Sequence, residues 1–127
     1  MNDLFAPFPG AIVMAWMPES EHACAPGPKF RPVLLLAENR RPDGTLEVLV
    51  AYGTSQQTSR IAPGEFTVRC QDAAFLAKDT RFSLNKRMWL SVTQEYFQRD
   101  GKTQVLGSLP AKSLRGAARA AQEVGIA

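Results

Sequence analysis

Residues 29–36 read Lys-Phe-Arg-Pro-Val-Leu-Leu-Leu, a basic segment that leads directly into an apolar run. Pro32 restricts Arg31 to extended conformations and removes a backbone donor, so these two residues are predicted to begin a strand. The apolar run from Val33 to Ala37 forms its buried part. The guanidinium of Arg31 is thereby placed at a strand entrance, where its planar donors suit a phosphate or a carboxylate. The alternative is a surface arginine beside a core strand.

The sequence after this strand predicts a β-hairpin. Pro42-Asp43-Gly44 stands between the first apolar run and a second one, Leu46 to Tyr52, and these three residue types favour turns. The second strand of a hairpin ends near the start of the first. Thr54 and Ser55, which follow the second strand, are therefore expected to lie close to Arg31.

Alternation of apolar residues and turn signals predict the remaining elements. Residues 11–17 are expected to form the first strand and residues 65–69 the fourth, with Phe66 and Val68 on its buried face. Further expected elements are a short helix at 71–77, a connecting loop with a strand-like middle at 79–85, a fifth strand at 88–92, a brief helical turn at 95–97 and a last strand or extended segment at 104–109.

From Pro110 the pattern changes to helical spacing, and Gly125 is expected to stop this helix. The predicted apolar face consists of Leu114, Ala117, Ala118, Ala121 and Val124. Several short strands with close turns and one terminal helix predict a mainly β fold. We expect a small, strongly curved antiparallel sheet or partly open barrel with a C-terminal helix.

The segment from Pro18 to Pro28 is too rich in Pro and Gly for helix or sheet and is expected to be an exposed loop. It contains Glu21 and the chain's single histidine, His22. Chain connectivity places this loop beside Arg31, so it could form one side of a functional cleft. Ordinary loop polarity is the alternative interpretation of both residues.

Composition favours a soluble protein with one domain, residues 1–127. No apolar run approaches the length of a membrane span, and the N-terminus lacks the features of a secretion signal, so we expect a cytoplasmic protein. Cys24 and Cys70 show no zinc-ligand spacing and are interpreted as free thiols, with a disulfide as the alternative. None of the 15 basic residues lies in residues 1–28. This asymmetry permits an anionic partner.

Three motifs in order carry a family resemblance: Pro-Gly-Ala-Ile-Val at 9–13 followed by Ser-Glu at 20–21, Lys-Phe-Arg-Pro-Val-Leu-Leu at 29–35, and Ala-Tyr-Gly-Thr-Ser-Gln at 51–56. Together they resemble the MazF/PemK toxins of bacterial type II toxin–antitoxin systems. Gly107-Ser108-Leu109 and the helix after it are also similar to the end of that family. The resemblance implies an SH3-like barrel, usually a homodimer. It also implies an enzyme that cuts single-stranded RNA without a metal or other cofactor and is neutralised by an antitoxin protein.

Carried over by motif, Arg31 matches the family's catalytic arginine and Thr54 its hydroxyl residue at the end of the third strand. RNA can be cleaved by its own 2′-OH, a reaction that requires proton transfer and stabilisation of charge on the phosphoryl oxygens. Arg31 suits the second task, and Thr54 could position the phosphate or the 2′-OH. Because arginine is a poor base, Glu21 and His22 are the candidates for removing the proton.

The candidate substrate-binding residues are Lys29, Ser55, Gln56 and Arg81. Arg81 stands where some family members place another functional arginine. The loop before Arg31 departs from the family because it is longer and richer in proline, and Glu19 stands where glycine is expected. Two further functions remain open: a non-catalytic SH3-like module that binds RNA or a peptide, and a toxin that acts on a protein such as a topoisomerase.

Overall fold

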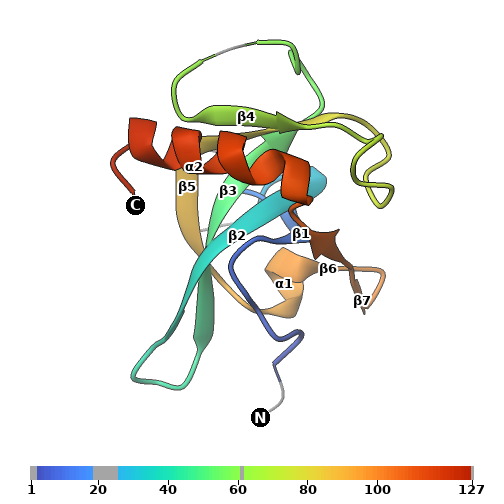
Figure 1. Cartoon of the computed structure of the whole chain (residues 1–127). Coiled ribbons are helices and arrows are strands. Elements are labelled where there is room, and N and C mark those ends of the chain that lie inside the picture. Colours follow the sequence, from blue (N-terminus) through green and yellow to red (C-terminus); the bar gives the residue numbers. More distant parts are fainter. Residues whose placement is uncertain (1–2, 19–25, 61, 127) are drawn as a thin grey trace.

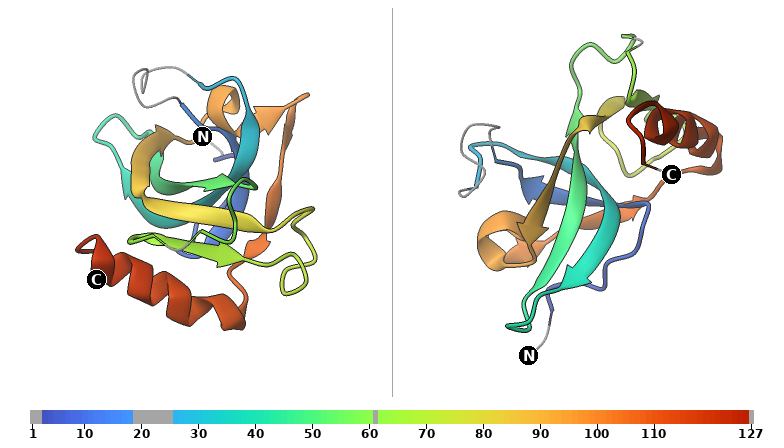
Figure 2. Two further views of the ribbon diagram at one scale, coloured as in Figure 1. Left: turned by 90° about the horizontal axis from the view of Figure 1, so that it is seen from above. Right: turned by 90° about the vertical axis from the view of Figure 1, so that its left-hand side faces the viewer.

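The computed structural model describes residues 3–18, 26–60 and 62–126. Its main element is a six-stranded antiparallel sheet with the strand order β4-β5-β3-β2-β1-β8. The sheet curls into a half-barrel and the C-terminal helix runs along its outside (Figure 1, Figure 2), so the predicted fold class is confirmed. The strands are β1 (Ala11–Trp16), β2 (Phe30–Arg40), β3 (Leu46–Thr54), β4 (Glu65–Val68), β5 (Thr80–Ser91) and β8 (Val105–Ser108).

Short elements connect and cover this sheet. A one-turn helix and a two-stranded hairpin follow β5, and a 3-10 turn leads into the C-terminal helix. They are α1 (Gln94–Phe97), β6 (Gln98–Arg99), β7 (Lys102–Thr103), η1 (Ala111–Ser113) and α2 (Leu114–Glu123). Among the described helices, none has the length and apolar character needed to cross a membrane.

The predicted hairpin is formed by β2 and β3. Its turn depends on Gly44, whose φ of +90° lies in the left-handed region that glycine adopts readily. The Asp43 carboxylate accepts the backbone N–H of Thr45 at 2.8 Å, and Arg41 and Thr45 close the ladder through a backbone hydrogen bond of 2.9 Å. The hairpin turn predicted from Pro-Asp-Gly is therefore confirmed.

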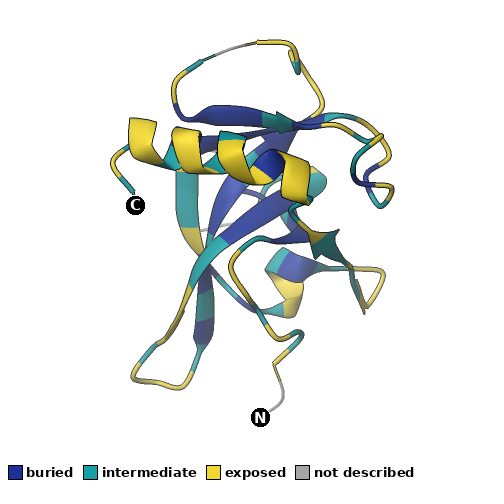
Figure 3. Cartoon of the chain, viewed as in Figure 1, coloured by how far each residue is buried: buried dark blue, intermediate teal, exposed yellow. Residues whose placement is uncertain are grey.

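Alternation along the strands supplies two hydrophobic cores, one on each face of the sheet. The first lies on the face opposite α2 and includes Phe97 of α1; the second is covered by α2 and includes Ala120. Phe66 and Val68 belong to the second core, as predicted. Figure 3 shows the strands largely buried, while α2 presents an exposed outer face.

Of the predictions about residues 71–92, the short helix is wrong, and the loop is wrong except for its strand-like middle. Residues 71–77 form successive turns rather than a helix, with backbone bonds such as Leu76 N–H to Ala73 O at 2.9 Å. The expected loop at 79–85 and the strand at 88–92 are one continuous strand, β5. Residues 80–84 are buried on both faces of the sheet, so they lack the alternation that marks a half-exposed strand.

The C-terminal helix forms, but its predicted apolar face is partly wrong. Leu114 is 54% exposed and Ala118 is also exposed. The side chains that face the second core are those of Ala117, Ala120, Ala121 and Val124. Contact with β4 sets this orientation, and the small alanine side chains allow the helix to lie close to the sheet.

Candidate functional site

Arg31 and Thr54 lie together at the end of the β2–β3 hairpin that is opposite its turn, here named the open end. The paired residues nearest this end are Val33 and Tyr52, and Arg31 and Thr54 each lie two residues beyond that pair. Both line the same cavity, together with Ser55. The proximity predicted from the hairpin is therefore confirmed.

Gly53 allows the two strands to approach each other closely at this end. A Cβ atom at this position would lie 2.4 Å from the carbonyl oxygen of Pro32 and 2.8 Å from the ring of Phe82. Neither neighbour can move easily, because one is strand backbone and the other is a fully buried ring. The glycine between Tyr52 and Thr54 is thus a steric requirement of the open end.

The cavity beside Thr54, named the Thr54 cavity, has a volume of about 470 Å³. Its polar lining comes from the start of β2, the end of β3 and the loop before β5, while its apolar lining includes Met14, Phe75 and Leu106. An anionic group attached to a flat or apolar moiety, such as a nucleotide, matches this combination. The polar lining residues are Lys29, Arg31, Thr54, Ser55, Lys78 and Thr80.

A second cavity, named the Tyr52 cavity, has a volume of about 510 Å³ and shares Lys29 and Arg31 with the first. The Arg31 Cζ atom lies 5.8 Å from the centroid of the Tyr52 ring, and the Lys86 Nζ atom lies 5.3 Å from it. Both distances permit cation–π attraction. Tyr52 therefore holds two cations beside one cavity, and Arg31 borders both cavities.

An irregularity in β5 directs its basic residues to the Tyr52 cavity. Ala51 pairs with Arg87 while the next residue of β3, Tyr52, pairs with Ser83, so residues 84–86 of β5 have no paired residue in β3. The Arg87 Nη1 atom donates to the carbonyl oxygen of Leu84 at 2.7 Å and closes this bulge. Bulges re-aim side chains in this way, and Lys86 is directed over Tyr52 as a result.

The described lining of the two cavities is strongly basic. It includes Lys29, Arg31, Lys78, Lys86 and Arg87 and contains no Asp, Glu or His from the described residues. Within residues 3–18, 26–60 and 62–126, none of these five cations forms an ion pair with a carboxylate. Such a group of cations attracts phosphate, because its charge is not neutralised by those parts of the protein.

The loop that carries Phe75 and Lys78 into the Thr54 cavity is closed by Asp79. Its carboxylate accepts the backbone N–H of Cys70 at 2.9 Å, and this hydrogen bond holds the pKa of Asp79 below its ordinary value. The Asp79 carboxylate in turn raises the pKa of the Cys70 thiol. Cys70 is a free thiol, as predicted, and Cys24 lies outside the described residues.

Thr54 has a structural contact in addition to its place in the cavity. Its side chain is buried, at 6% exposure, and its Oγ1 atom accepts the backbone N–H of Gln56 at 3.2 Å. One lone pair of the hydroxyl is used in this turn, while its proton remains available for donation to a ligand. A turn-capping role and a ligand-binding role are therefore compatible at this residue.

Only some of the predicted site residues line these cavities. Lys29, Arg31, Thr54 and Ser55 are brought together, whereas Glu21 and His22 lie outside the described residues. Gln56 and Arg81 line neither cavity. Arg81 is buried and forms an ion pair with Glu65 at 2.7 Å.

Sequence reasoning missed Tyr52, Lys78, Lys86 and Arg87 as parts of the site. Tyr52 had a usable signal, since it alternates with Thr54 on one face of the expected strand. The polar run Asn-Lys-Arg at 85–87 also lies between apolar segments, but its local pattern predicts a connection rather than a bulged strand. Nothing in the local sequence indicates that Lys78 reaches the end of β3.

Within the part of the chain that the structure describes, no three His, Cys, Asp or Glu side chains are grouped closely enough to hold a metal ion. A scan against models of protein families and a search of curated proteins found no match to the chain.

Proposed function

We propose that this protein is a toxin-like endoribonuclease that cleaves single-stranded RNA without a metal ion. The observation that carries the proposal is the position of Arg31, which borders two basic cavities and lines one of them together with Thr54. The motif resemblance to MazF/PemK toxins points to the same two residues. Geometry and resemblance therefore support one reaction centre.

In the proposed reaction the scissile phosphate binds beside Arg31. The guanidinium donates to its non-bridging oxygens and stabilises the charge that develops as the 2′-OH attacks the phosphorus. The Thr54 hydroxyl donates a hydrogen bond to the same phosphate or orients the 2′-OH. Its oxygen already accepts a hydrogen bond from Gln56 N–H, which leaves the hydroxyl hydrogen for the ligand. The oxygen–phosphorus bond to the next nucleoside breaks, which leaves a 2′,3′-cyclic phosphate and a free 5′-hydroxyl.

A base must remove the 2′-OH proton, and an acid must supply a proton to the leaving 5′ oxygen. The described lining holds no carboxylate or imidazole. In this proposal Glu21 or His22 of the preceding loop therefore takes the proton from the 2′-OH, and a solvent water molecule supplies the proton to the leaving 5′ oxygen. Their substitution by Gln and Ala, respectively, is expected to lower the rate of cleavage more than the affinity for RNA.

The two cavities provide room for nucleotides on either side of Arg31. Lys29 and Lys78 contact phosphates at the Thr54 cavity, while Lys86 and Arg87 contact the strand at the Tyr52 cavity. Ser55 adds a hydrogen-bonding hydroxyl beside Thr54. As the resemblance implies, we also propose that the protein forms a homodimer and is neutralised by a cognate antitoxin protein. On the basis of the sequence features described above, we propose that it acts in the cytoplasm.

The proposal is tested by incubating the purified protein with unstructured RNA in the presence of a chelator. Cleavage products should carry 2′,3′-cyclic phosphate ends, and an RNA with 2′-O-methyl groups should stay intact. Products formed equally from the 2′-O-methyl RNA would contradict the mechanism. Saturable binding without any product would instead support the second candidate function, a non-catalytic RNA-binding module, which the basic cavities favour.

A further inference from the structure

The residue Glu65 is a buried carboxylate that lines neither the Thr54 cavity nor the Tyr52 cavity. It lies at the start of β4 and is 6% exposed. Its Oε2 atom lies 2.7 Å from Arg81 Nη1, and its Oε1 atom lies 3.2 Å from Arg60 Nε. Removing a carboxylate and its arginine partners from water costs desolvation free energy. Such a buried ion pair is therefore weak evidence for a role in stability alone.

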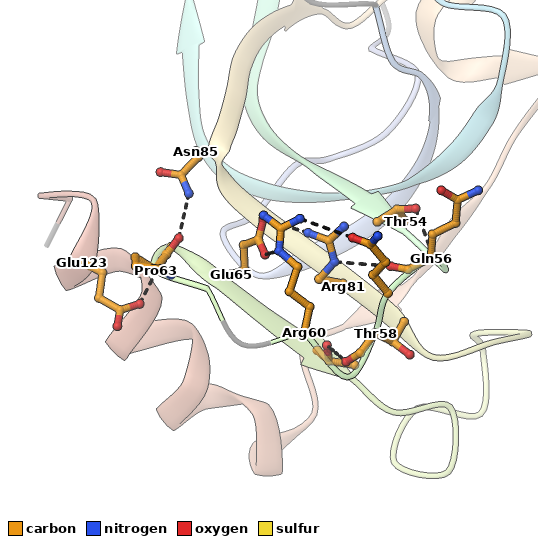
Figure 4. A network of polar contacts seen from close by, with 12 residues as sticks. Thr54, Gln56, Thr58, Arg60, Pro63, Glu65, Arg81, Asn85 and Glu123 are labelled. Carbon is orange, nitrogen blue, oxygen red and sulfur yellow. Dashed lines mark hydrogen bonds and ion pairs between the residues drawn. The ribbon is translucent and has the colours of Figure 1, made fainter.

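Arg81 connects this carboxylate to the Thr54 turn. Strand pairing places Arg81 opposite Thr54 on one side and opposite Thr67 on the other. While its Nη1 atom contacts Glu65, its Nε atom donates to the backbone carbonyl oxygen of Gln56 at 3.3 Å. Figure 4 shows Glu65, Arg81 and Gln56 following one another toward Thr54.

Hydrogen bonds therefore hold the turn at both backbone groups of Gln56. The Gln56 N–H is donated to Thr54 Oγ1, and the Gln56 C=O accepts from Arg81. Thr67 holds the same loop two residues after Gln56, because its hydroxyl donates to Thr58 O at 2.7 Å. Because Thr54 Oγ1 accepts from the Gln56 N–H, contacts that hold Gln56 also restrain the Thr54 side chain.

We infer that Glu65 and Arg81 are positioning residues for the Thr54 hydroxyl, and that Arg81 acts through the Gln56 carbonyl rather than by contact with RNA. This inference rests on the proposed function and deepens it. Glu65 holds the guanidinium of Arg81 in one orientation, Arg81 holds the turn, and the turn presents Thr54 beside Arg31. A displacement of about 1 Å at a reacting group can lower a rate about 100-fold.

Arg81→Lys is the decisive variant, because it keeps a positive charge beside the buried carboxylate. A lysine has one compact ammonium group and cannot hold Glu65 and the Gln56 carbonyl with the geometry of a planar guanidinium. The matched control is Arg60→Lys. Arg60 contacts the same carboxylate but is half exposed and donates nothing to the Gln56 carbonyl.

Two measurements test the inference. For Arg81→Lys we expect kcat for RNA cleavage to fall about 10- to 100-fold, with KM changed less than about threefold. The amide hydrogen of Gln56 should exchange with solvent at least about tenfold faster, because its turn opens more often. Arg60→Lys should change each quantity less than about threefold.

Several results would overturn the inference. A raised KM with unchanged kcat would mean that Arg81 binds substrate directly, and an unchanged Gln56 exchange rate would mean that it does not hold the turn. Faster exchange of the Gln56 amide hydrogen with an unchanged kcat would show that Arg81 has no role in the reaction. If the wild-type protein cleaves no RNA, the proposed function fails, while the exchange measurement still decides whether Glu65 and Arg81 hold the Thr54 turn.

Discussion

The two ends of the β2–β3 hairpin use the same basic residue types in opposite ways. At the turn end, Arg40 forms an ion pair with Asp3 at 3.0 Å, and Arg41 forms one with Glu47 at 2.8 Å. Hydrogen bonds from Arg40 to Asp3, and from Asn39 and Arg41 to Glu47, hold the pKa values of both carboxyl groups below their ordinary range. Each arginine there is neutralised locally, so the turn end is stabilised but does not attract an anion.

At the open end, the cations gather around cavities and have no carboxylate partner among the described residues. Arg31 and Lys86 are held by the face of Tyr52 instead. A ring face orients a cation without cancelling its charge. Ion pairs therefore neutralise the arginines at the turn end, while the cations at the cavities keep their charge available for a ligand.

The largest effect is expected from the two glycines of the hairpin. Gly53→Ala should destabilise the protein by about 2 to 3 kcal/mol, because the added methyl group meets Pro32 backbone and the Phe82 ring. Gly44→Ala should cost about 1 kcal/mol, since its φ of +90° is unfavourable for alanine while no atom lies within 4 Å. Urea unfolding monitored by fluorescence measures both. Equal losses would mean that the open end is not sterically constrained.

The next effect concerns the affinity for RNA. Lys86→Ala should weaken the binding of a 2′-O-methyl RNA about three- to tenfold and reduce the slope of log K against log salt by about 0.7, as expected for one lost phosphate contact. Arg41→Ala at the turn end should leave both quantities unchanged. Fluorescence anisotropy at several salt concentrations measures them. An equal loss of affinity in the two variants would show that Lys86 attracts RNA only through the overall charge of the protein and not through a phosphate contact.

The smallest effect is a pH dependence of stability that comes from the turn end. The pKa values of Asp3, Asp43 and Glu47 are lowered in the folded protein by hydrogen bonds from Arg40, the Thr45 backbone N–H, and Asn39 with Arg41. The unfolded chain therefore binds protons more readily. This stabilisation is fully present above a pH of about 5 and is lost as the pH falls through the lowered pKa values.

Glu47→Gln tests this dependence, because an amide cannot titrate. The free energy of unfolding of this variant should change less than that of the wild-type protein between pH 5 and pH 3. These two pH values lie about one unit above and one unit below the ordinary carboxyl pKa. Urea midpoints across this range provide the measurement. If the two proteins lose stability in parallel, the turn-end carboxylate does not contribute.

The hairpin and the proximity of Arg31 to Thr54 could be predicted because their signals are local. Arg31-Pro32 limits the start of one strand, and Pro-Asp-Gly at 42–44 marks the turn. Antiparallel pairing then brings the two ends together without further information. These elements depend on residues that are neighbours in the sequence or in one hairpin.

The rest of the site depends on contacts between distant segments. Lys86 reaches Tyr52 through a bulge whose position is set by the pairing of β5 with β3. Arg81 meets Glu65 only because β4 pairs with β5 in one register. From the local sequence alone, Lys86 is predicted to lie in a connection and Arg81 to bind substrate. The hydrophobic pattern of one strand does not specify its register with a distant strand.

The most direct test compares Arg31→Ala with Arg40→Ala, two changes of the same residue type at opposite ends of β2. The rate of RNA cleavage in a chelator should fall at least about 100-fold for Arg31→Ala, because a donor to the developing phosphoryl charge is lost. It should change less than about twofold for Arg40→Ala, whose ion pair lies on the surface. Undiminished cleavage by a folded Arg31→Ala protein would contradict the assignment of the open end as the reaction centre.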